Sequence, residues 1–229
     1  MLCTQAVIES EADLRALRGV VCNGRFPVEA NEMGAVQLLA DRTRFVAGPH
    51  INLYNPPALR VLAALGMMRW VLPLELPRTA LAGMQRERPP GVETEVFALG
   101  RMPLAFSARC FTARHHGLRK DDCDFRCRED PDGLLLRTQE GAPFLVLNGI
   151  QTQSAAVYSL AGQIEELSAL GVDVLRLSPQ SEHMGDVVEW FRARLDGRCP
   201  AAQADAALAP LLPGPMVAGY WHGRAGMLV

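Results

Sequence analysis

The sequence predicts an α/β protein built from repeated strand–helix units. Short apolar runs alternate with amphipathic helical segments along most of the 229 residues, a pattern typical of parallel βα repeats. Several of these runs are almost continuously apolar, as expected for strands buried on both faces. Complete (β/α)8 barrels typically need about 250 residues, and the strand-like runs do not reach the eight that such a barrel requires. We therefore predict a (β/α)8 TIM-type barrel that is incomplete at its N-terminus, with an open doubly wound sheet as the alternative.

Local signals place the elements in order. Strands are expected at 1–7, 26–30, 45–48, 67–74, 93–99, 144–147 and 172–177. Helices are expected at 10–22, 31–39, 56–66, 78–85, 158–170 and 184–195. The first helix has the clearest start, because Ser10 and Asp13 have the spacing of a capping box, and Asn23-Gly24 follows its apolar stripe. Asn31 is expected to cap the second helix, and Pro56-Pro57 to open the third.

The chain is expected to contain one main domain and a tail. Residues 1–198 form the partial barrel, and this range includes a cysteine-containing segment, 107–133, that interrupts the strand–helix rhythm. Residues 199–229 are rich in Ala and Pro, which predicts a loosely structured C-terminal tail.

Composition excludes several classes of function. The formal net charge is −2, so we expect no broad basic face and no nucleic-acid partner. We expect no membrane span, because the most apolar stretch, 58–76, is interrupted by Arg60 and Arg69. The N-terminus lacks the basic-then-apolar layout of a signal peptide. A cytoplasmic protein with reduced thiols is the expectation.

The cysteine-containing segment carries the strongest chemical signal. Three of the six cysteines have the spacing Cys110-x12-Cys123-x3-Cys127 in a region crowded with Arg, His and Asp. Thiolates in such a polar setting favour an iron–sulfur cluster, zinc or Cu(I), and nearby cations favour the thiolate form. The spacing is not that of paired structural zinc ligands. His115 and His116 keep a Cys3His zinc site as a competing interpretation, and isolated reduced cysteines or a disulfide remain further ones.

Polar residues recur where the predicted strands end, which is where functional groups gather in parallel βα folds. The catalytic candidates are His50, Glu75 and Arg109. The substrate-binding candidates are Glu29, Asn31, Asn52, Asn148, Gln151, Ser178 and Gln180. Each has a structural alternative: His50 could be a structural histidine, Glu75 a solvated carboxylate and Ser178 the start of a turn. The sequence contains no HExxH, GxSxG, GxGxxG or P-loop pattern.

The sequence resembles the collagenase-like (U32) peptidase family. The similarity covers essentially the whole chain, and the segments that carry it are LAFSARCFTAR, KDDC, VEANEMGAVQLL, FVAGPHINLYN, GMMRWVLPLEL, VLNGIQT, RLSPQ and GYW. Within this family the chain is most similar to a branch of oxygen-independent ubiquinone biosynthesis. That resemblance implies a barrel fold and a subunit of an anaerobic ring-hydroxylation system rather than a conventional peptidase.

The resemblance also implies a cofactor and partners. It implies a 4Fe-4S cluster held by four cysteines, of which three match Cys110, Cys123 and Cys127. Neither Cys3 nor Cys22 has the sequence context of the fourth, so we expect that ligand to be absent from this chain, which looks truncated at its N-terminus. The implied partners are a UbiU-like protein in a heterodimer, the lipid-binding accessory protein UbiT, and an aromatic quinone precursor as substrate.

Two alternative functions remain open at this stage. One is a peptidase or other hydrolase of the same wider family. The other is a non-catalytic binding subunit in which zinc only stabilises the cysteine-containing segment.

Overall fold

The computed structural model describes residues 1–119 and 122–228. The chain divides into two compact units. Unit 1 contains Met1–Phe97, Leu167–Leu175 and Tyr220–Gly223, and unit 2 contains Ala98–Glu166, Arg176–Gly219 and a short stretch from Arg224. The predicted boundary between residues 198 and 199 falls inside unit 2. Three elements, β5 (Glu93–Phe106), α6 (Ile164–Ala169) and β9 (Val174–Leu177), run from one unit into the other.

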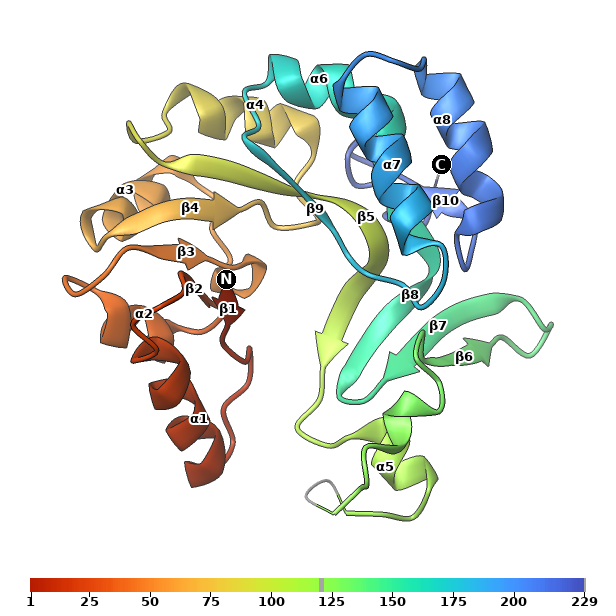
Figure 1. The fold of residues 1–229 in the computed structure, drawn as a ribbon, viewed down its shortest axis with the longest axis horizontal. Coiled ribbons are helices and arrows are strands. Elements are labelled where there is room, and N and C mark those ends of the chain that lie inside the picture. Colours follow the sequence, from red (N-terminus) through yellow and green to blue (C-terminus); the bar gives the residue numbers. More distant parts are fainter. Residues whose placement is uncertain (120–121, 229) are drawn as a thin grey trace. The chain divides into compact units, whose positions relative to one another are not determined.

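Unit 1 follows the predicted strand–helix alternation. Its elements are β1 (Leu2–Cys3), α1 (Glu11–Val21), β2 (Val28–Ala30), α2 (Met33–Leu39), β3 (Phe45–Ala47), a 3-10 turn η1 (Pro49–Ile51), α3 (Pro56–Ala64), β4 (Met67–Val71) and α4 (Arg78–Arg86). Strands β1 to β5 pair in chain order, and every pair is parallel. Figure 1 shows β2, β3 and β4 side by side in this order. The prediction of an α/β protein with parallel βα repeats is therefore confirmed for this unit.

The strands of unit 1 are short and buried. All three residues of β2 and all three of β3 are buried, as predicted for a sheet covered on both faces. Trp70 is the largest fully buried side chain in this unit's sheet, and its indole Nε1 donates to Thr94 Oγ1 at 3.0 Å. The hydroxyl of Thr94 in turn donates to Gln85 Oε1 at 2.8 Å. A buried indole needs such an acceptor, so this network joins the sheet to α4.

Unit 2 departs from the predicted parallel barrel. It contains α5 (Phe111–His115), the 3-10 turn η2 (Arg126–Arg128), β6 (Leu134–Arg137), β7 (Pro143–Asn148), β8 (Gln151–Ser159), 3-10 turns η3 (Ala161–Gln163) and η4 (Ala209–Leu211), α7 (Met184–Leu195), α8 (Ala201–Leu208) and β10 (Met216–Val217). Strands β5, β8, β7 and β6 pair antiparallel, whereas β10 pairs parallel with β8. The described strands thus form a mixed sheet.

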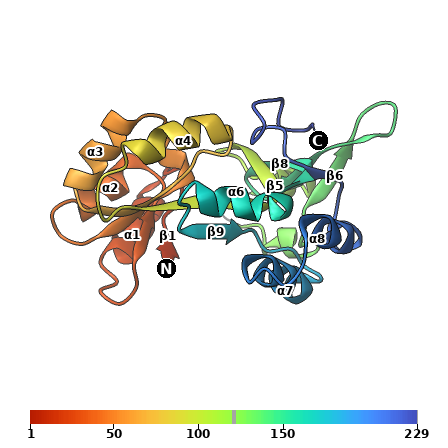
Figure 2. The ribbon, with the colours of Figure 1, turned by 90° about the horizontal axis from the view of Figure 1, so that it is seen from above.

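Two predicted features of unit 2 are wrong. Residues 151–159 form strand β8, and the helix expected at 158–170 is limited to α6 after the η3 turn. The tail expected to be loosely structured contains α8, which lies beside α7 in Figures 1 and 2. Its apolar side chains Ala204 and Leu208 are fully buried, so this burial stabilises a helix that the Ala/Pro-rich composition does not predict.

The predicted helix starts have mixed outcomes. Ser10 and Asp13 form the expected capping box at the start of α1. Asn31, in contrast, does not cap α2. The side chain of Glu32 accepts hydrogen bonds from Gly34 N and Ala35 N and is the N-cap instead. In the described part of the chain, no helix combines the length and apolar character needed to cross a lipid bilayer.

Candidate functional site

The three motif cysteines lie in unit 2, between β5 and β6. Cys110 is the N-cap residue of α5, and its Sγ accepts a hydrogen bond from Ala113 N at 3.4 Å. Cys127 lies in the 3-10 turn η2. All three are free thiols, and each is half-buried. Residues 120 and 121, which belong to this segment, lie outside the described residues. Because all three thiols are free and partly exposed, they can react or bind a metal.

Arginines surround the first motif cysteine. Cys110 lines a cavity of about 340 Å³ together with Arg109, Arg114, Gly117 and Leu118. Arg109, a predicted catalytic candidate, is exposed, and its backbone N–H donates to Ser107 Oγ at 3.1 Å. The arginine side chains give this side of Cys110 a positive charge, which suits an anionic group.

The segment does not form a complete metal site as it stands. Among the residues that the structure describes, no group of three or more His, Cys, Asp or Glu side chains gathers closely enough to hold a metal ion. His115 and His116 lie edge to face with ring centroids 5.1 Å apart, and both are exposed. Neither the cluster nor the Cys3His arrangement is preformed in this conformation, so the segment would have to close around a metal.

In unit 1, the carboxyl ends of the parallel strands bring two predicted site residues together. Asn31 Nδ2 donates to Glu29 Oε1 at 3.1 Å and to Thr4 O at 3.2 Å, while Asn31 N donates to Thr4 Oγ1 at 2.9 Å. All three residues are buried. Asn31 Oδ1 is also buried and accepts no hydrogen bond from the described residues. This carboxylate–amide pair is buried at the carboxyl end of the parallel sheet.

Gly48, which follows β3, makes this close packing possible. A Cβ placed on Gly48 would lie 2.0 Å from Asn31 Oδ1 and 2.9 Å from Glu29 Oε1. Real Cβ atoms do not approach other atoms this closely, so a side chain at residue 48 would displace the pair. The absence of a side chain on Gly48 thus allows the Glu29–Asn31 pair to occupy its position.

The other predicted residues of unit 1 are more exposed. His50 is half-buried in the η1 turn, and Asn52 ends that turn in the left-handed backbone conformation with an exposed side chain. The exposed carboxylate of Glu75 accepts a hydrogen bond from the Tyr54 hydroxyl. Partial burial and then the Glu75 carboxylate raise the pKa of Tyr54 to about 12.

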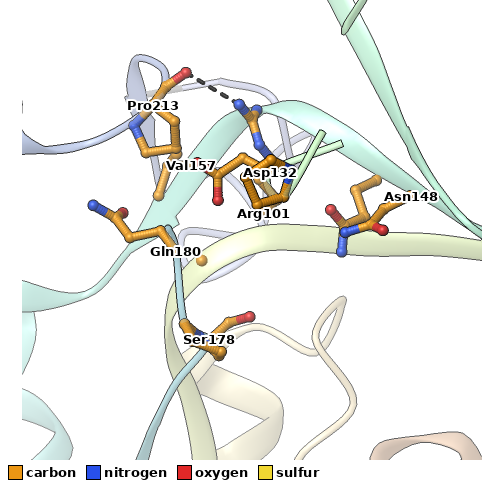
Figure 3. A pocket seen from close by; sticks show the side chains of 11 residues that line it. Arg101, Asp132, Asn148, Val157, Ser178, Gln180 and Pro213 are labelled. Carbon is orange, nitrogen blue, oxygen red and sulfur yellow. Dashed lines mark hydrogen bonds between the residues drawn. The ribbon is translucent and has the colours of Figure 1, made fainter. Parts of the chain in front are cut away.

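A polar cavity in unit 2 gathers three predicted substrate-binding residues. Asn148 ends β7, and Ser178 and Gln180 follow β9; all three line a cavity of about 60 Å³. Gln151 does not line the cavity itself. Its Oε1 accepts a hydrogen bond at 2.6 Å from Nε2 of Gln153, and Gln153 lines the cavity. Figure 3 shows Asn148, Ser178 and Gln180 around the cavity, together with Arg101, Asp132 and Pro213. Three of the predicted residues thus lie at one cavity.

Arg101 and Asp132 are the charged residues that line this cavity, and neither is among the predicted site residues. Arg101 Nη1 donates to the carbonyls of Ser154 and Ala155, and Nη2 donates to Pro213 O at 3.1 Å. Burial lowers the pKa of Arg101, while the nearby Asp132 carboxylate opposes this shift. Asp132 accepts hydrogen bonds from the backbone N–H and hydroxyl of Ser181.

The chemistry of this cavity is that of a small polar binding site. One arginine and one aspartate give it no large net charge, and amide and hydroxyl groups supply both donors and acceptors. Its volume of about 60 Å³ is well below the cavity of about 150 Å³ that holds a benzene ring in an engineered protein. It can therefore hold a few water molecules or one polar substituent, but not a whole aromatic ring.

Comparison with known proteins places the chain in a family. The family model of peptidase family U32 matches residues 27–224, which is most of the chain. The chain belongs to peptidase family U32. A solved structure described as the U32 peptidase Mk0906 is similar to this chain with 14% sequence identity and a TM-score of 0.37. The similar region covers 75% of this chain and 64% of that chain, so this chain spans less than two thirds of that protein's length.

The site residues that were not predicted from the sequence have only weak sequence signals. Arg101 is a charged residue inside an otherwise apolar run, ALGRMPLAF, which indicates a structural or functional partner for a buried cation. Asp132 lies in a stretch of Asp, Pro and Gly, which is indistinguishable from an ordinary turn. Thr4, the third member of the Glu29–Asn31 cluster, has no local signal at all.

Proposed function

We propose that this U32 family member is a UbiV-like, iron–sulfur subunit of an oxygen-independent ring-hydroxylation system in ubiquinone biosynthesis, acting in the cytoplasm. The observation that carries the proposal is the cysteine motif: three free, half-buried thiols at Cys110, Cys123 and Cys127 in a polar segment beside arginines. Membership of the U32 family supports it, as does the resemblance of segments such as LAFSARCFTAR and KDDC to the ubiquinone-biosynthesis branch. The parallel repeats of unit 1 are compatible with part of an incomplete (β/α)8 barrel.

The proposed cofactor is a 4Fe-4S cluster with Cys110, Cys123 and Cys127 as three ligands and the fourth ligand outside this chain. In the described conformation no three-ligand group is assembled, so the proposal requires segment 107–133 to rearrange on metal binding. Such coupling of metal binding to local folding is common, because a preformed site rarely exists without the metal. When bound, the cluster would supply electron transfer.

The proposed substrate is an aromatic quinone precursor. Glu29, Asn31, Asn52, Asn148, Gln151, Ser178 and Gln180 are proposed to contact it, with His50, Glu75 and Arg109 as candidates for catalysis. The size of the unit 2 cavity restricts the role of its residues, since Asn148, Ser178 and Gln180 enclose room for a polar substituent only. We therefore propose that these three side chains bind a ring substituent by hydrogen bonds. The proposed protein partners are a UbiU-like protein, in a heterodimer, and the accessory protein UbiT.

The test compares two cysteine variants of this chain produced anaerobically with its UbiU-like partner. Cys123→Ser removes a proposed ligand, and Cys22→Ser removes an exposed thiol outside the motif and serves as the matched control. We expect Cys123→Ser to remain folded but to lose iron, acid-labile sulfide and ring hydroxylation, while Cys22→Ser retains all three. Full hydroxylation by a folded Cys123→Ser complex would reject the proposal.

Peptidase activity is the second candidate, and family membership is the observation that favours it. It predicts cleavage of a collagen-like or gelatin substrate that is lost when Asn148 or Glu29 is replaced. Preparations free of cleavage at all protein concentrations would reject it. A zinc-stabilised, non-catalytic subunit would instead contain zinc in place of iron, and hydroxylation would proceed with the partner protein alone.

A further inference from the structure

A third cavity lies in unit 1, at the opposite end of the strands from Glu29 and Asn31. It has a volume of about 520 Å³ and is lined by residues 21–27, by residues 42–44, by Val28 at the start of β2 and by Met68 of β4. Ligand-binding pockets are typically about 300–1,000 Å³. This cavity is thus large enough for a small organic molecule.

The cavity is basic. Arg25, Arg42 and Arg44 line it, all three are exposed, and no Asp or Glu belongs to the described residues that line it. None of the three forms an ion pair with another described residue. Asp41 precedes Arg42 in the chain but does not line the cavity. In a protein of net charge −2, three uncompensated guanidinium groups around one hollow favour an anion.

Part of the cavity lining is apolar. Phe26 is 47% exposed, and Val28 and Met68 contribute further apolar surface. The Arg25 guanidinium lies 5.0 Å from the centroid of the Phe26 ring. Such exposed aromatic surface beside cations is typical of a site that binds the apolar body of an anion.

Local hydrogen bonds hold the arginine and the phenylalanine in place. Asn23 Oδ1 accepts from Arg25 N at 2.9 Å and from Phe26 N at 2.6 Å. Asn23 Nδ2 donates back to Val20 O at 2.8 Å. The turn that carries two of the lining side chains is therefore ordered before any ligand arrives, which lowers the entropy cost of binding.

We propose that this cavity binds a small organic anion in which a phosphate or carboxylate group is attached to an apolar ring. The arginines would bind the oxyanion, since guanidinium groups match both phosphate and carboxylate geometry. Phe26 and Met68 would contact the ring. This proposal depends on neither the cysteine motif nor the hydroxylation proposal.

The test measures binding of three probes to the full chain by isothermal titration calorimetry at low salt. Phenyl phosphate and benzoate share a ring and differ in the anionic group, and inorganic phosphate has no ring. We expect saturable binding of at least one ring-bearing anion, and the tighter of the two identifies the anionic group. Inorganic phosphate should bind at least about tenfold more weakly, because it buries no apolar surface.

Variants assign the binding to this cavity. Arg42→Gln and Arg44→Gln should each weaken binding of the ring-bearing anion about tenfold, the effect of losing one charged hydrogen bond. Arg86→Gln removes an exposed arginine of α4 outside the cavity and should leave affinity unchanged. Circular dichroism should show all variants folded, because these side chains are exposed. The proposal is overturned if neither ring-bearing anion binds, if inorganic phosphate binds as tightly, or if Arg42→Gln and Arg44→Gln retain full affinity.

Discussion

The packing of Gly48 against the Glu29–Asn31 pair predicts the effect of one added methyl group. In Gly48→Ala the new Cβ would lie 2.0 Å from Asn31 Oδ1 and 2.7 Å from Asn31 Cγ. The backbone itself is no obstacle, since Gly48 has φ −70° and ψ 171°, which alanine adopts freely. Overpacking of this kind costs about 2 kcal/mol, and displacing the Asn31 amide from its acceptors costs about 1 kcal/mol more. Alanine also lowers the backbone entropy of the unfolded chain, and this offsets about 0.7 kcal/mol of the destabilisation.

We therefore expect Gly48→Ala to lower the free energy of unfolding by about 2 kcal/mol, measured by urea denaturation with tryptophan fluorescence. Gly19→Ala is the matched control, because Gly19 lies inside α1 and nothing lies within 4 Å of its added Cβ. This control should raise stability by about 0.5–1 kcal/mol. Adding Asn31→Ala to Gly48→Ala removes the contacts at 2.0 and 2.7 Å and leaves only the contact at 2.9 Å with Glu29 Oε1. The double variant should therefore be more stable than the sum of the two single effects predicts. A Gly48→Ala protein as stable as the original would show that the Glu29–Asn31 pair does not need a glycine at residue 48.

Three further predictions concern individual side chains. Thr94→Val leaves the buried Trp70 indole N–H without its acceptor, so the free energy of unfolding should fall by about 1–3 kcal/mol. A double-mutant cycle with Trp70→Phe, measured by urea unfolding, should give a coupling energy of about 1–2 kcal/mol. Additive effects of the two substitutions would contradict the hydrogen bond between these side chains. Glu75→Gln should lower the pKa of Tyr54 from about 12 toward 10.0, measured by tyrosinate absorbance. The pKa of Tyr54 is higher in the folded than in the unfolded state, so the neutral phenol stabilises the folded protein. This stabilisation is fully present below pH 10 and is lost as the pH rises toward 12. A Tyr54→Phe protein has no phenol to titrate and should not show this pH-dependent loss. Arg101→Leu removes hydrogen bonds to three backbone carbonyls and should lower the free energy of unfolding by about 1–3 kcal/mol. An unchanged midpoint of urea unfolding would show that these hydrogen bonds do not contribute to stability.

Features that depend on neighbouring residues were predictable from the sequence. The capping box at Ser10 and Asp13 is confirmed, and helix α7 has the expected bounds, Met184–Leu195. The first strands are also where expected, because each is a short apolar run between turn residues. The parallel repeats of unit 1 follow from this alternation.

Features that depend on distant contacts were not predictable. The sequence predicts a helix from residue 158, whereas β8 continues to Ser159, because an apolar run such as 155–160 has no period that separates a buried strand from a buried helix. The antiparallel pairing of β7 and β8, by contrast, has a local signal: only residues 149 and 150 separate the two strands, and Gly149 has a positive φ, as in a hairpin turn. Asn31 looked like a helix cap, yet its side chain bonds Thr4, which is 27 positions away, and the neighbouring Glu32 caps the helix.

The candidate site shows the same division. Asn148, Ser178 and Gln180 were chosen because polar residues follow strands, and these three line one cavity. Arg101 was missed because a single charge in an apolar run gives no indication of what it binds. Its partners are carbonyls of residues 154, 155 and 213, which only the fold brings within reach.

The proposed function depends most on binding of an iron–sulfur cluster by the cysteine motif. It is tested by an anaerobic visible absorption spectrum with iron, zinc and sulfide analysis, recorded on the unaltered protein, Cys123→Ser and Cys22→Ser, each purified with the UbiU-like partner. We expect a brown chromophore that dithionite bleaches in the unaltered protein and in Cys22→Ser, and its loss in Cys123→Ser. A colourless unaltered protein with stoichiometric zinc would overturn the proposal and would identify the segment as a structural metal site.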